Sequence, residues 1–154
     1  MTTYYLDASA LSKRYVQESG TAWMRALLDP GPGRTLLTAR ATMVEIYSTL
    51  ARRRREGSVP PDACAIAVRS FTIHCATDYE FVELDMRVVS QARVLLEQYA
   101  LRAYDAVQLA SALIVQQLLQ VAQLPALVFV SADDRLNRVA AAEGLAVDNP
   151  NAHP

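Results

Sequence analysis

The sequence predicts an α/β domain of three layers, in which helices cover both faces of a mostly parallel sheet of about five strands. Short runs of β-branched or aromatic residues alternate along the chain with segments of helical periodicity, and parallel strands need helical crossovers of this kind. The length of 154 residues is typical of one domain. A hydrophobic fraction of 52% is enough for a full core and excludes disordered or collagen-like classes.

The expected elements follow from periodicity and from turn signals. The strongest turn signal is the Pro/Gly cluster at residues 29–33, while Gly57 and Gly144 end helices and the pair Pro60-Pro61 opens one. We expect strands at residues 3–6, 34–38, 79–84 and 126–130, and a weaker one at 145–147. We expect helices at residues 8–16, 21–28, 41–56, 61–76, 86–99, 104–121 and 135–143.

The charge balance excludes a general electrostatic attraction to polyanions. Lys and Arg total 15 against 16 Asp and Glu, so the net charge is −1 and the isoelectric point about 6.1. Lys13 is the only lysine, because every other basic residue is arginine. Any contact with nucleic acid must therefore depend on local charges.

The cysteines and the apolar segments point to a cytoplasmic protein without a membrane anchor. Cys64 and Cys75 lack metal-ligand spacing and lie about 16 Å apart along one predicted helix, too far for a disulfide. The first residues show no secretory pattern. The most apolar stretch, residues 109–130, is interrupted by glutamines and a proline, so it does not predict a transmembrane helix.

Four acidic residues from distant segments are expected at one edge of the sheet. Asp7 ends the first predicted strand, and Asp133 follows the fourth almost directly. Glu45 lies in the first turns of the helix after the second strand, and Asp105 begins an apolar helix. Ligands of open α/β sheets bind at the carboxyl ends of strands, where the strand order reverses. The sequence therefore predicts a site that collects these carboxylates.

Each of these acids also has a structural interpretation. Asp7, Asp105 and Asp133 could cap helices, and Glu45 could be an exposed helix residue. Their convergence favours a metal site, because neighbouring carboxylates raise one another's pKa unless a cation neutralises them. Neither His74 nor His153 is near these positions. Oxygen ligands alone suit Mg²⁺ or Mn²⁺, and such a site suits phosphodiester hydrolysis.

Four segments resemble the acidic motifs of PIN-domain ribonucleases, particularly the VapC-type toxins of bacterial toxin–antitoxin pairs. They are YYLDASAL, the Glu45 segment ATMVEIYSTLARRRR, LRAYDAVQLASAL and FVSADDRLNRVAAAEGL. The most specific is the DAxxLA pattern at residues 105–110. The resemblance covers nearly the whole chain in order, as one nuclease domain at residues 1–148 with a C-terminal tail at 149–154.

The resemblance implies which residues form the site. The catalytic and metal-binding acids would be Asp7, Glu45, Asp105 and Asp133, with Ser9 and Ser131 as supporting hydroxyls. Asp134 adjoins the fourth acid, but the T/S-x-D pattern fits Asp133. The family also implies a five-stranded parallel sheet, Mg²⁺ or Mn²⁺ as cofactor, RNA as substrate, a homodimer, and inhibition by a cognate antitoxin whose tail enters the acidic groove.

Arg52 is a candidate contact to RNA. It lies on the same helical stripe as Glu45, so it could reach a phosphate and supply local positive charge. The whole run at residues 52–55 also has a structural interpretation, since cations at a helix C-terminus interact favourably with the helix dipole.

Other functions fit the acids less well but stay open. A haloacid-dehalogenase-like phosphohydrolase needs a second Asp where the chain has Ser9. It also needs a lysine near the phosphate, and the only lysine, Lys13, lies on the predicted helix just after Asp7, which is not its expected place in the chain. A receiver domain needs an acceptor Asp after the third strand and a late lysine, and a Rossmann domain needs glycines after the first strand. A PIN fold kept only for binding is the remaining alternative.

Overall fold

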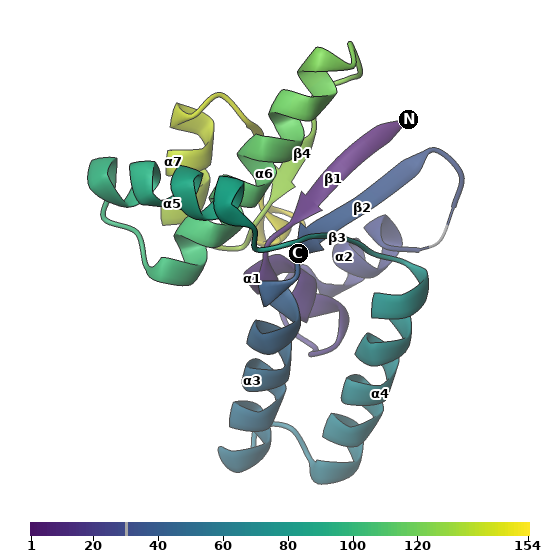
Figure 1. Cartoon of the computed structure of the whole chain (residues 1–154). Coiled ribbons are helices and arrows are strands. Elements are labelled where there is room, and N and C mark those ends of the chain that lie inside the picture. Colours follow the sequence, from purple (N-terminus) through teal and green to yellow (C-terminus); the bar gives the residue numbers. More distant parts are fainter. Residues whose placement is uncertain (30) are drawn as a thin grey trace.

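The computed structural model describes residues 1–29 and 31–154 and confirms the expected three-layer α/β/α architecture (Figure 1). Its sheet is parallel throughout and has the strand order β3-β2-β1-β4-β5. The strands are β1 (Thr2–Leu6), β2 (Arg34–Ala39), β3 (Glu80–Val82), β4 (Val128–Val130) and β5 (Ala146–Asp148). The order reverses between β1 and β4, so a crevice is expected where these two strands end.

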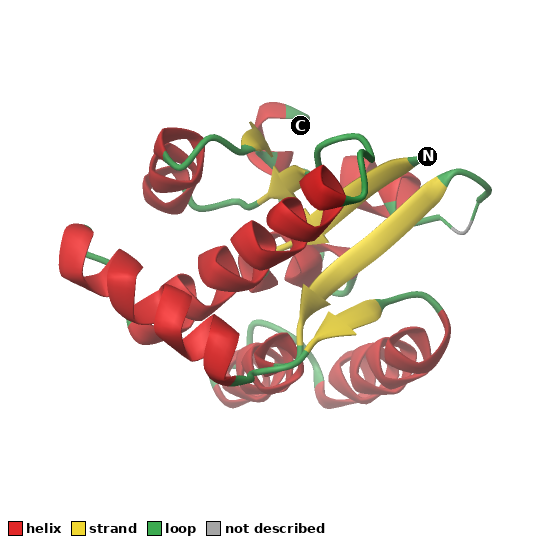
Figure 2. Ribbon diagram, turned by 45° about the horizontal axis from the view of Figure 1, so that its top comes forward, coloured by secondary structure: helices red, strands yellow, loops and turns green. Residues whose placement is uncertain are grey.

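The helices divide between the two faces of the sheet (Figure 2). One face is covered by α1 (Ala8–Leu11), the 3-10 turn η1 (Ser12–Arg14), α2 (Thr21–Leu27), α3 (Ala41–Arg55) and α4 (Pro61–Thr77). The other face is covered by α5 (Met86–Gln98), α6 (Ala103–Val121) and α7 (Asp134–Ala142). The chain closes with a second 3-10 turn, η2 (Pro150–Ala152).

Successive side chains along each strand point to opposite faces of the sheet, so the strands contribute to two separate hydrophobic cores. Tyr5 and Phe129 face α5, α6 and α7, and their rings stack with centroids 5.7 Å apart. Their neighbours Leu6 and Val130 face the other way, into the core formed with α1 to α4. Strands buried on both faces are the usual design of parallel sheets under crossover helices.

Three expected elements differ from those observed. The helix predicted at residues 8–16 breaks into α1 and η1, and this turn brings the buried Lys13 amine within 2.9 Å of the Ser19 carbonyl. The strand predicted at 79–84 is shorter because β3 pairs only with residues 37–39 of β2. The strand predicted at 126–130 begins only at Val128, where its pairing with β1 begins. The predicted turn at residues 29–33 includes Pro30, which lies outside the described residues.

The last residues pack against the domain instead of extending from it. Pro150 of η2 is buried against Gly20, which has a left-handed φ of 81° and whose added Cβ would lie 2.4 Å from the Pro150 oxygen. The Trp23 ring stacks on His153 with centroids 4.2 Å apart. The C-terminal residues therefore lie over α2, close to the end of β4.

Both cysteines lie on α4. Cys64 and Cys75 are both free, the first buried and the second partly exposed. Throughout residues 1–29 and 31–154, no helix combines the length and apolar character needed to cross a membrane.

Candidate metal and catalytic site

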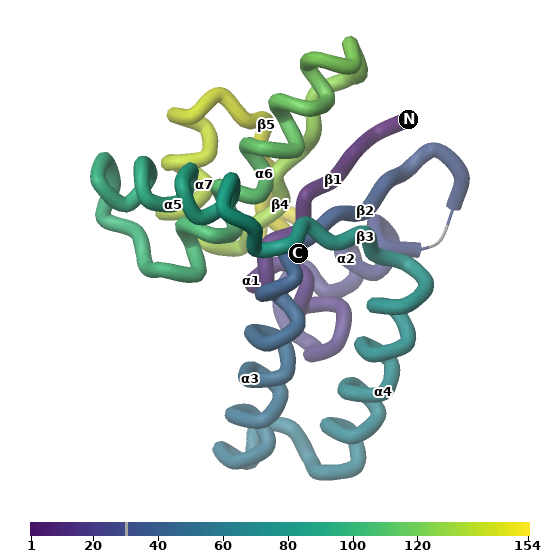
Figure 3. The backbone as a smooth tube through the Cα atoms, in the orientation of Figure 1, coloured from purple at the N-terminus to yellow at the C-terminus, as the bar shows by residue number. Residues whose placement is uncertain are grey.

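Asp7 directly follows β1, the central strand of the sheet. Figure 3 shows β1 between β2 and β4. The Asp7 backbone N–H donates to the Val130 carbonyl at 3.0 Å, which continues the pairing of β1 with β4. Its carboxylate is only 4% exposed and caps α1 by accepting from the Ser9 N–H at 3.3 Å. The same carboxylate therefore caps α1 and lies at the carboxyl end of the central strand.

Ser9 and Ser131 hold one oxygen of Asp7 from both sides. The two hydroxyls donate to Asp7 Oδ2, Ser131 at 2.9 Å and Ser9 through a short hydrogen bond. The same hydroxyls accept backbone N–H groups from the loop after β4: Ala132 donates to Ser9 and Asp133 to Ser131. The serines thereby tie the first acid to the loop that carries the fourth, and they leave Asp7 Oδ1 for a ligand.

Glu45 lies near the start of α3 and is partly buried. Gln108 of α6 donates from its amide nitrogen to Glu45 Oε2 at 2.6 Å and to the Thr42 hydroxyl at 2.7 Å. The carbonyl oxygen of Gln108 accepts from the Tyr5 hydroxyl at 3.0 Å. Glu45 is therefore not a freely solvated helix residue, and one of its oxygens is already bound within the protein.

Asp105 and Asp133 lie at the starts of two helices on the other face of the sheet. Asp105 lies in the first turn of α6, whose N-cap is Arg102, so it does not cap this helix itself. Asp133 is the N-cap of α7 and accepts from the N–H groups of Arg135 at 2.9 Å and Leu136 at 3.1 Å, all through Oδ1. The capping interpretation therefore holds for Asp133 but not for Asp105.

Burial first, and then the charges of neighbouring carboxylates, raise the pKa of Asp7, Glu45 and Asp105. Burial raises the pKa of Asp7, the serine hydrogen bonds lower it, and the charge of Asp105 raises it. Burial raises the pKa of Glu45 to about 7, against the hydrogen bond from Gln108, and the charges of Asp7 and Asp105 add to the rise. Burial and the charge of Asp133 raise the pKa of Asp105. These four acids thus share one electrostatic environment.

The donor set fits a hard cation held by few protein ligands. In the described part of the chain, no three His, Cys, Asp or Glu side chains are close enough to enclose an ion. Mg²⁺ is normally held by one or two carboxylates and keeps several waters, so it does not require such a cage. Carboxylate oxygens alone suit Mg²⁺ or Mn²⁺ better than Zn²⁺, which is usually held by nitrogen or sulfur ligands.

Arg52 and Asp134 lie apart from the carboxylates. Arg52 is exposed about two turns after Glu45, and its nearest charged partner is Glu56, at 4.0 Å and one turn further along α3. Asp134 accepts from the side-chain amide of Asn149 at 2.7 Å, so it faces the C-terminal residues. Both stay outside the group of four acids.

Gln108, Thr42 and Asn137 were not expected at the site from the sequence. Gln108 is 1% exposed in an apolar helix, one turn after Asp105, and Thr42 lies one turn before Glu45. Asn137 donates to the Ser131 carbonyl at 2.8 Å. The sequence pattern that could have identified these residues is a polar residue within an otherwise apolar helical face, one turn from a candidate acid.

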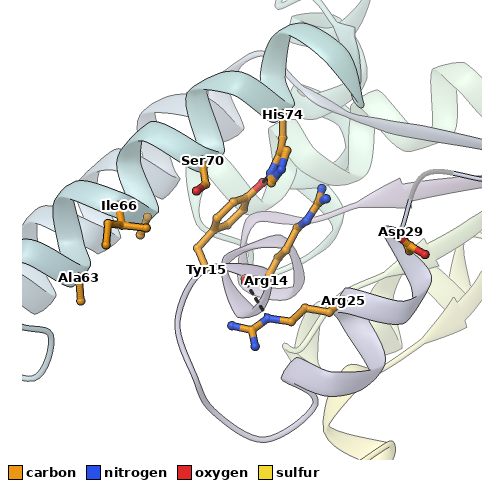
Figure 4. Close-up of a pocket in the computed structure, with 9 residues that line it drawn as sticks. Arg14, Tyr15, Arg25, Asp29, Ala63, Ile66, Ser70 and His74 are labelled. Carbon is orange, nitrogen blue, oxygen red and sulfur yellow. Dashed lines mark hydrogen bonds between the residues drawn. The ribbon is translucent and has the colours of Figure 1, made fainter.

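A cavity of about 490 Å³ lies away from the acids, between η1 and α2 on one side and α4 on the other (Figure 4). Arg14, Tyr15 and Arg25 line one side of it, and Ile66 and His74 of α4 line the other. None of the four candidate acids lines this cavity. It is a separate surface feature lined by both apolar and charged side chains.

The fold defines the class of this protein, and the chain belongs to the PIN domain family, whose model matches residues 4–142. Two curated relatives are Ribonuclease VapC45 and Ribonuclease VapC49 of Mycobacterium tuberculosis. Each is 34% identical to this chain over 147 residues, which cover 96% of this chain and 95% of the relative.

Solved structures share the fold at low sequence identity. VapBC2 from Rickettsia felis, bound to a promoter DNA fragment, matches with a TM-score of 0.64 and 12% identity over 96% of this chain and 98% of that one. Mycobacterium tuberculosis VapC20, described as a sarcin–ricin loop cleaving toxin, matches at 0.62 and 15% over 93% and 96%. A toxin–antitoxin complex from Klebsiella pneumoniae matches at 0.56 and 14% over 96% and 97%.

Proposed function

We propose that this protein is a Mg²⁺- or Mn²⁺-dependent endoribonuclease and the toxin of a toxin–antitoxin pair. The observation that supports the proposal is the electrostatic coupling among Asp7, Glu45, Asp105 and Asp133 in a PIN domain related to VapC ribonucleases. RNA is the proposed substrate, and the cytoplasm, where thiols stay reduced, is the proposed location.

The four acids would hold the metal, which when bound activates water and stabilises the charge that develops on the leaving oxygen. Ser9 and Ser131 keep Asp7 fixed, and the N-terminus of α7 keeps Asp133 fixed, so both acids are oriented before substrate binds. Water attacks the phosphorus, the bond to the 3′ oxygen breaks, and this oxygen leaves with a proton. The products are a 5′-phosphate and a free 3′-hydroxyl.

Histidine-based cleavage is not supported by the placement of the two histidines. His74 lines the separate cavity and bonds to the Tyr15 hydroxyl at 2.8 Å, while His153 bonds to Asp148 at 2.8 Å. An acid–base ribonuclease would use the 2′-hydroxyl of the RNA as nucleophile and leave a cyclic phosphate. The crevice offers no imidazole for this chemistry.

The products of cleavage test the proposal. We expect an RNA with a single 2′-deoxy sugar at the scissile position to be cut in Mg²⁺ or Mn²⁺, and EDTA to abolish cutting. Mass spectrometry should find 5′-phosphate and 3′-hydroxyl ends. A 2′,3′-cyclic phosphate, or cleavage that survives EDTA, would show that the four carboxylates are not the catalytic groups.

The rival phosphohydrolase is disfavoured by the surroundings of Asp7. The residue two positions on, Ser9, uses its hydroxyl to hold the Asp7 carboxylate and cannot act as a second acid. The only lysine amine, that of Lys13, donates to the Ser19 carbonyl and lies 3.6 Å from Glu18, so it is not free to bind a phosphate. A PIN domain kept only for binding would show no metal-dependent cleavage in the product assay.

An antitoxin partner is supported by two of the similar structures, which are toxin–antitoxin complexes. The unneutralised carboxylates would attract a basic tail, and the cavity beside α4 could accept an apolar segment of the same partner. Ile66, which is exposed in this cavity, is the proposed contact.

Substitution at this cavity tests the proposed antitoxin surface. Ile66→Glu should prevent binding of the protein encoded by the neighbouring reading frame and leave RNA cleavage intact. Ile73→Glu, at another exposed position of α4, is the matched control. If Ile66→Glu bound the antitoxin as tightly as this control, the partner would occupy another surface.

A homodimer is proposed through α5 and α6. Large apolar side chains are exposed on this face, and a cavity of about 430 Å³ lies between the two helices. The exposed residues are Leu84, Met86, Val89 and Leu96. A contiguous apolar patch of this kind is typical of a protein–protein interface.

A further inference from the structure

One side-chain amide joins three of the elements that carry the acids. Gln108 lies on α6 one turn after Asp105, and its amide nitrogen reaches Glu45 Oε2 at 2.6 Å and the Thr42 hydroxyl at 2.7 Å on α3. Its carbonyl oxygen accepts from the hydroxyl of Tyr5, which lies two residues before Asp7 on β1. Gln108, Thr42 and Tyr5 are each at most 1% exposed, so water does not compete for these hydrogen bonds.

The partners of Gln108 allow only one orientation of its amide. Glu45 must be ionised to bind a cation, and an ionised carboxylate accepts hydrogen bonds and donates none, so the NH₂ group must face it. Tyr5 can then donate to the carbonyl oxygen. A flipped amide would place two acceptor oxygens against each other at Glu45 and would lose both hydrogen bonds from the NH₂ group. The Glu45 carboxylate therefore sets the orientation of the amide, and the Tyr5 hydroxyl stabilises it by donating to the Gln108 carbonyl oxygen.

We propose that Gln108, oriented by Tyr5, is a positioning residue that holds Glu45 through Oε2 and leaves Oε1 as the single oxygen of Glu45 for the metal. This role rests on the proposed function, because it presumes that the four acids bind a cation. Groups that orient a metal ligand from behind commonly change metal affinity by about 10- to 100-fold when they are removed. A purely structural Gln108 would only satisfy buried polar atoms, and its loss would change stability but not metal affinity.

Direct measurement of Mn²⁺ affinity separates these two roles. The free Mn²⁺ signal in electron paramagnetic resonance gives the Kd without any substrate. Gln108→Met keeps the length of the side chain and removes the amide, and we expect it to weaken Mn²⁺ binding about tenfold or more. Tyr5→Phe keeps the stacked ring and removes the hydroxyl, and we expect a smaller loss of about three- to tenfold by the same mechanism.

Tyr47→Phe is the matched control. It removes a tyrosine hydroxyl from the same helix as Glu45, but this hydroxyl bonds to Thr72 on α4 at 2.7 Å. We expect the Mn²⁺ affinity of Tyr47→Phe to equal that of the wild type. Thermal melts of all variants identify any loss of folding, and the milder Tyr5→Phe keeps the test valid if Gln108→Met is unstable.

The double variant of Tyr5 and Gln108 tests whether Tyr5 affects Mn²⁺ binding only through Gln108. If Tyr5 acts only through Gln108, adding Tyr5→Phe to Gln108→Met should weaken Mn²⁺ binding no further. Fully additive losses, or unchanged affinity in Gln108→Met, would overturn the positioning role while the wild type still binds Mn²⁺. A wild type that binds no Mn²⁺ would overturn the proposed function and this role together.

Discussion

Asp7 shows how one residue can be both a helix cap and a candidate metal ligand. Its Oδ2 is taken by Ser9 and Ser131, and the same oxygen accepts the capping N–H of α1, so a cation would bind at Oδ1. The structural and functional interpretations of this aspartate are therefore compatible, because they use different oxygens of one carboxylate. Burial that raises the pKa of Asp7 makes this carboxylate costly to keep ionised without a cation.

Asp7→Asn should remove most activity and leave the metal-free protein as stable as the wild type or slightly more stable, because a buried charge is lost. Mn²⁺ at a hundredfold excess over its Kd stabilises a binding-competent protein by about 2.7 kcal/mol. This corresponds to roughly 5–10 °C for a domain of this size. We expect this gain for the wild type, and a much smaller one for Asp7→Asn, in thermal melts.

Asp134→Asn is the control for this measurement, because Asp134 bonds to Asn149 and lies outside the acidic group. It should retain the full gain in melting temperature with Mn²⁺. Equal gains in the wild type and Asp7→Asn would disprove a shared metal site that includes Asp7.

The ion pair of Arg14 and Asp78 links stability to pH. Burial raises the pKa of Asp78, but hydrogen bonds from Thr77 and Arg14 and the charge of Arg14 outweigh it, so the pKa is lowered overall. An acid with a lowered pKa in the folded state stabilises the protein above its ordinary pKa of 3.8 and loses this contribution as pH falls through the folded value.

We therefore expect the free energy of unfolding to fall as the pH drops below the ordinary aspartate pKa of 3.8, and to fall less steeply in Asp78→Asn. Urea unfolding at several pH values measures both slopes. Exposed Glu97, paired with Arg93 at 3.0 Å, supplies the control substitution Glu97→Gln, which should leave the wild-type slope unchanged because exposed pairs contribute little. An identical slope in Asp78→Asn and wild type would exclude this linkage.

At the scale of elements, α3 carries both a candidate ligand and a candidate substrate contact. Glu45 lies near its start, and the arginine run lies in its last turn, where cations are favourable to the helix dipole. Arg53 in this run pairs with Glu18 at 3.1 Å, whereas Arg52 points to solvent with only a weak neighbour. An extended RNA strand bound at the crevice could follow α3 to Arg52.

If Arg52 contacts an RNA phosphate, Arg52→Ala should weaken binding and lower the salt slope by about 0.7. Filter binding or fluorescence anisotropy over a range of salt concentrations measures this slope. Arg55→Ala is the matched control, because Arg55 lies off the stripe that contains Glu45. Indistinguishable slopes in the two variants would favour a solvated helix end.

At the scale of the whole molecule, the exposed apolar face of α5 and α6 predicts self-association. Val89→Glu should convert the proposed dimer into a monomer, because it places a charge within an apolar interface. Sedimentation velocity measures the change. Val121→Glu, at an 84% exposed valine at the end of α6, is the matched control and should stay dimeric. A wild type that sediments as a monomer at micromolar concentration would contradict the proposal.

The sequence by itself determined the class of fold, the order of the elements and the edge at which the acids meet. Local periodicity distinguishes strands from helices, and parallel strands joined by crossovers place their carboxyl ends together. Asp7 and Asp133 follow adjacent parallel strands and therefore had to approach each other. Glu45 and Asp105 were predicted at this edge from their positions near the starts of helices, and in the structure both act electrostatically on one another or on Asp7.

Only the tertiary structure decided which carboxylate oxygens of these acids are already hydrogen-bonded within the protein. Gln108 and Glu45 are far apart in sequence, and nothing local predicts that α6 presents this amide to α3. The hydrogen bond from Asn149 to Asp134 and the contact of Pro150 with Gly20 likewise depend on how distant segments pack. Periodicity assigns a residue to a face of its own element, whereas its partner across that face is decided by the packing of the whole chain.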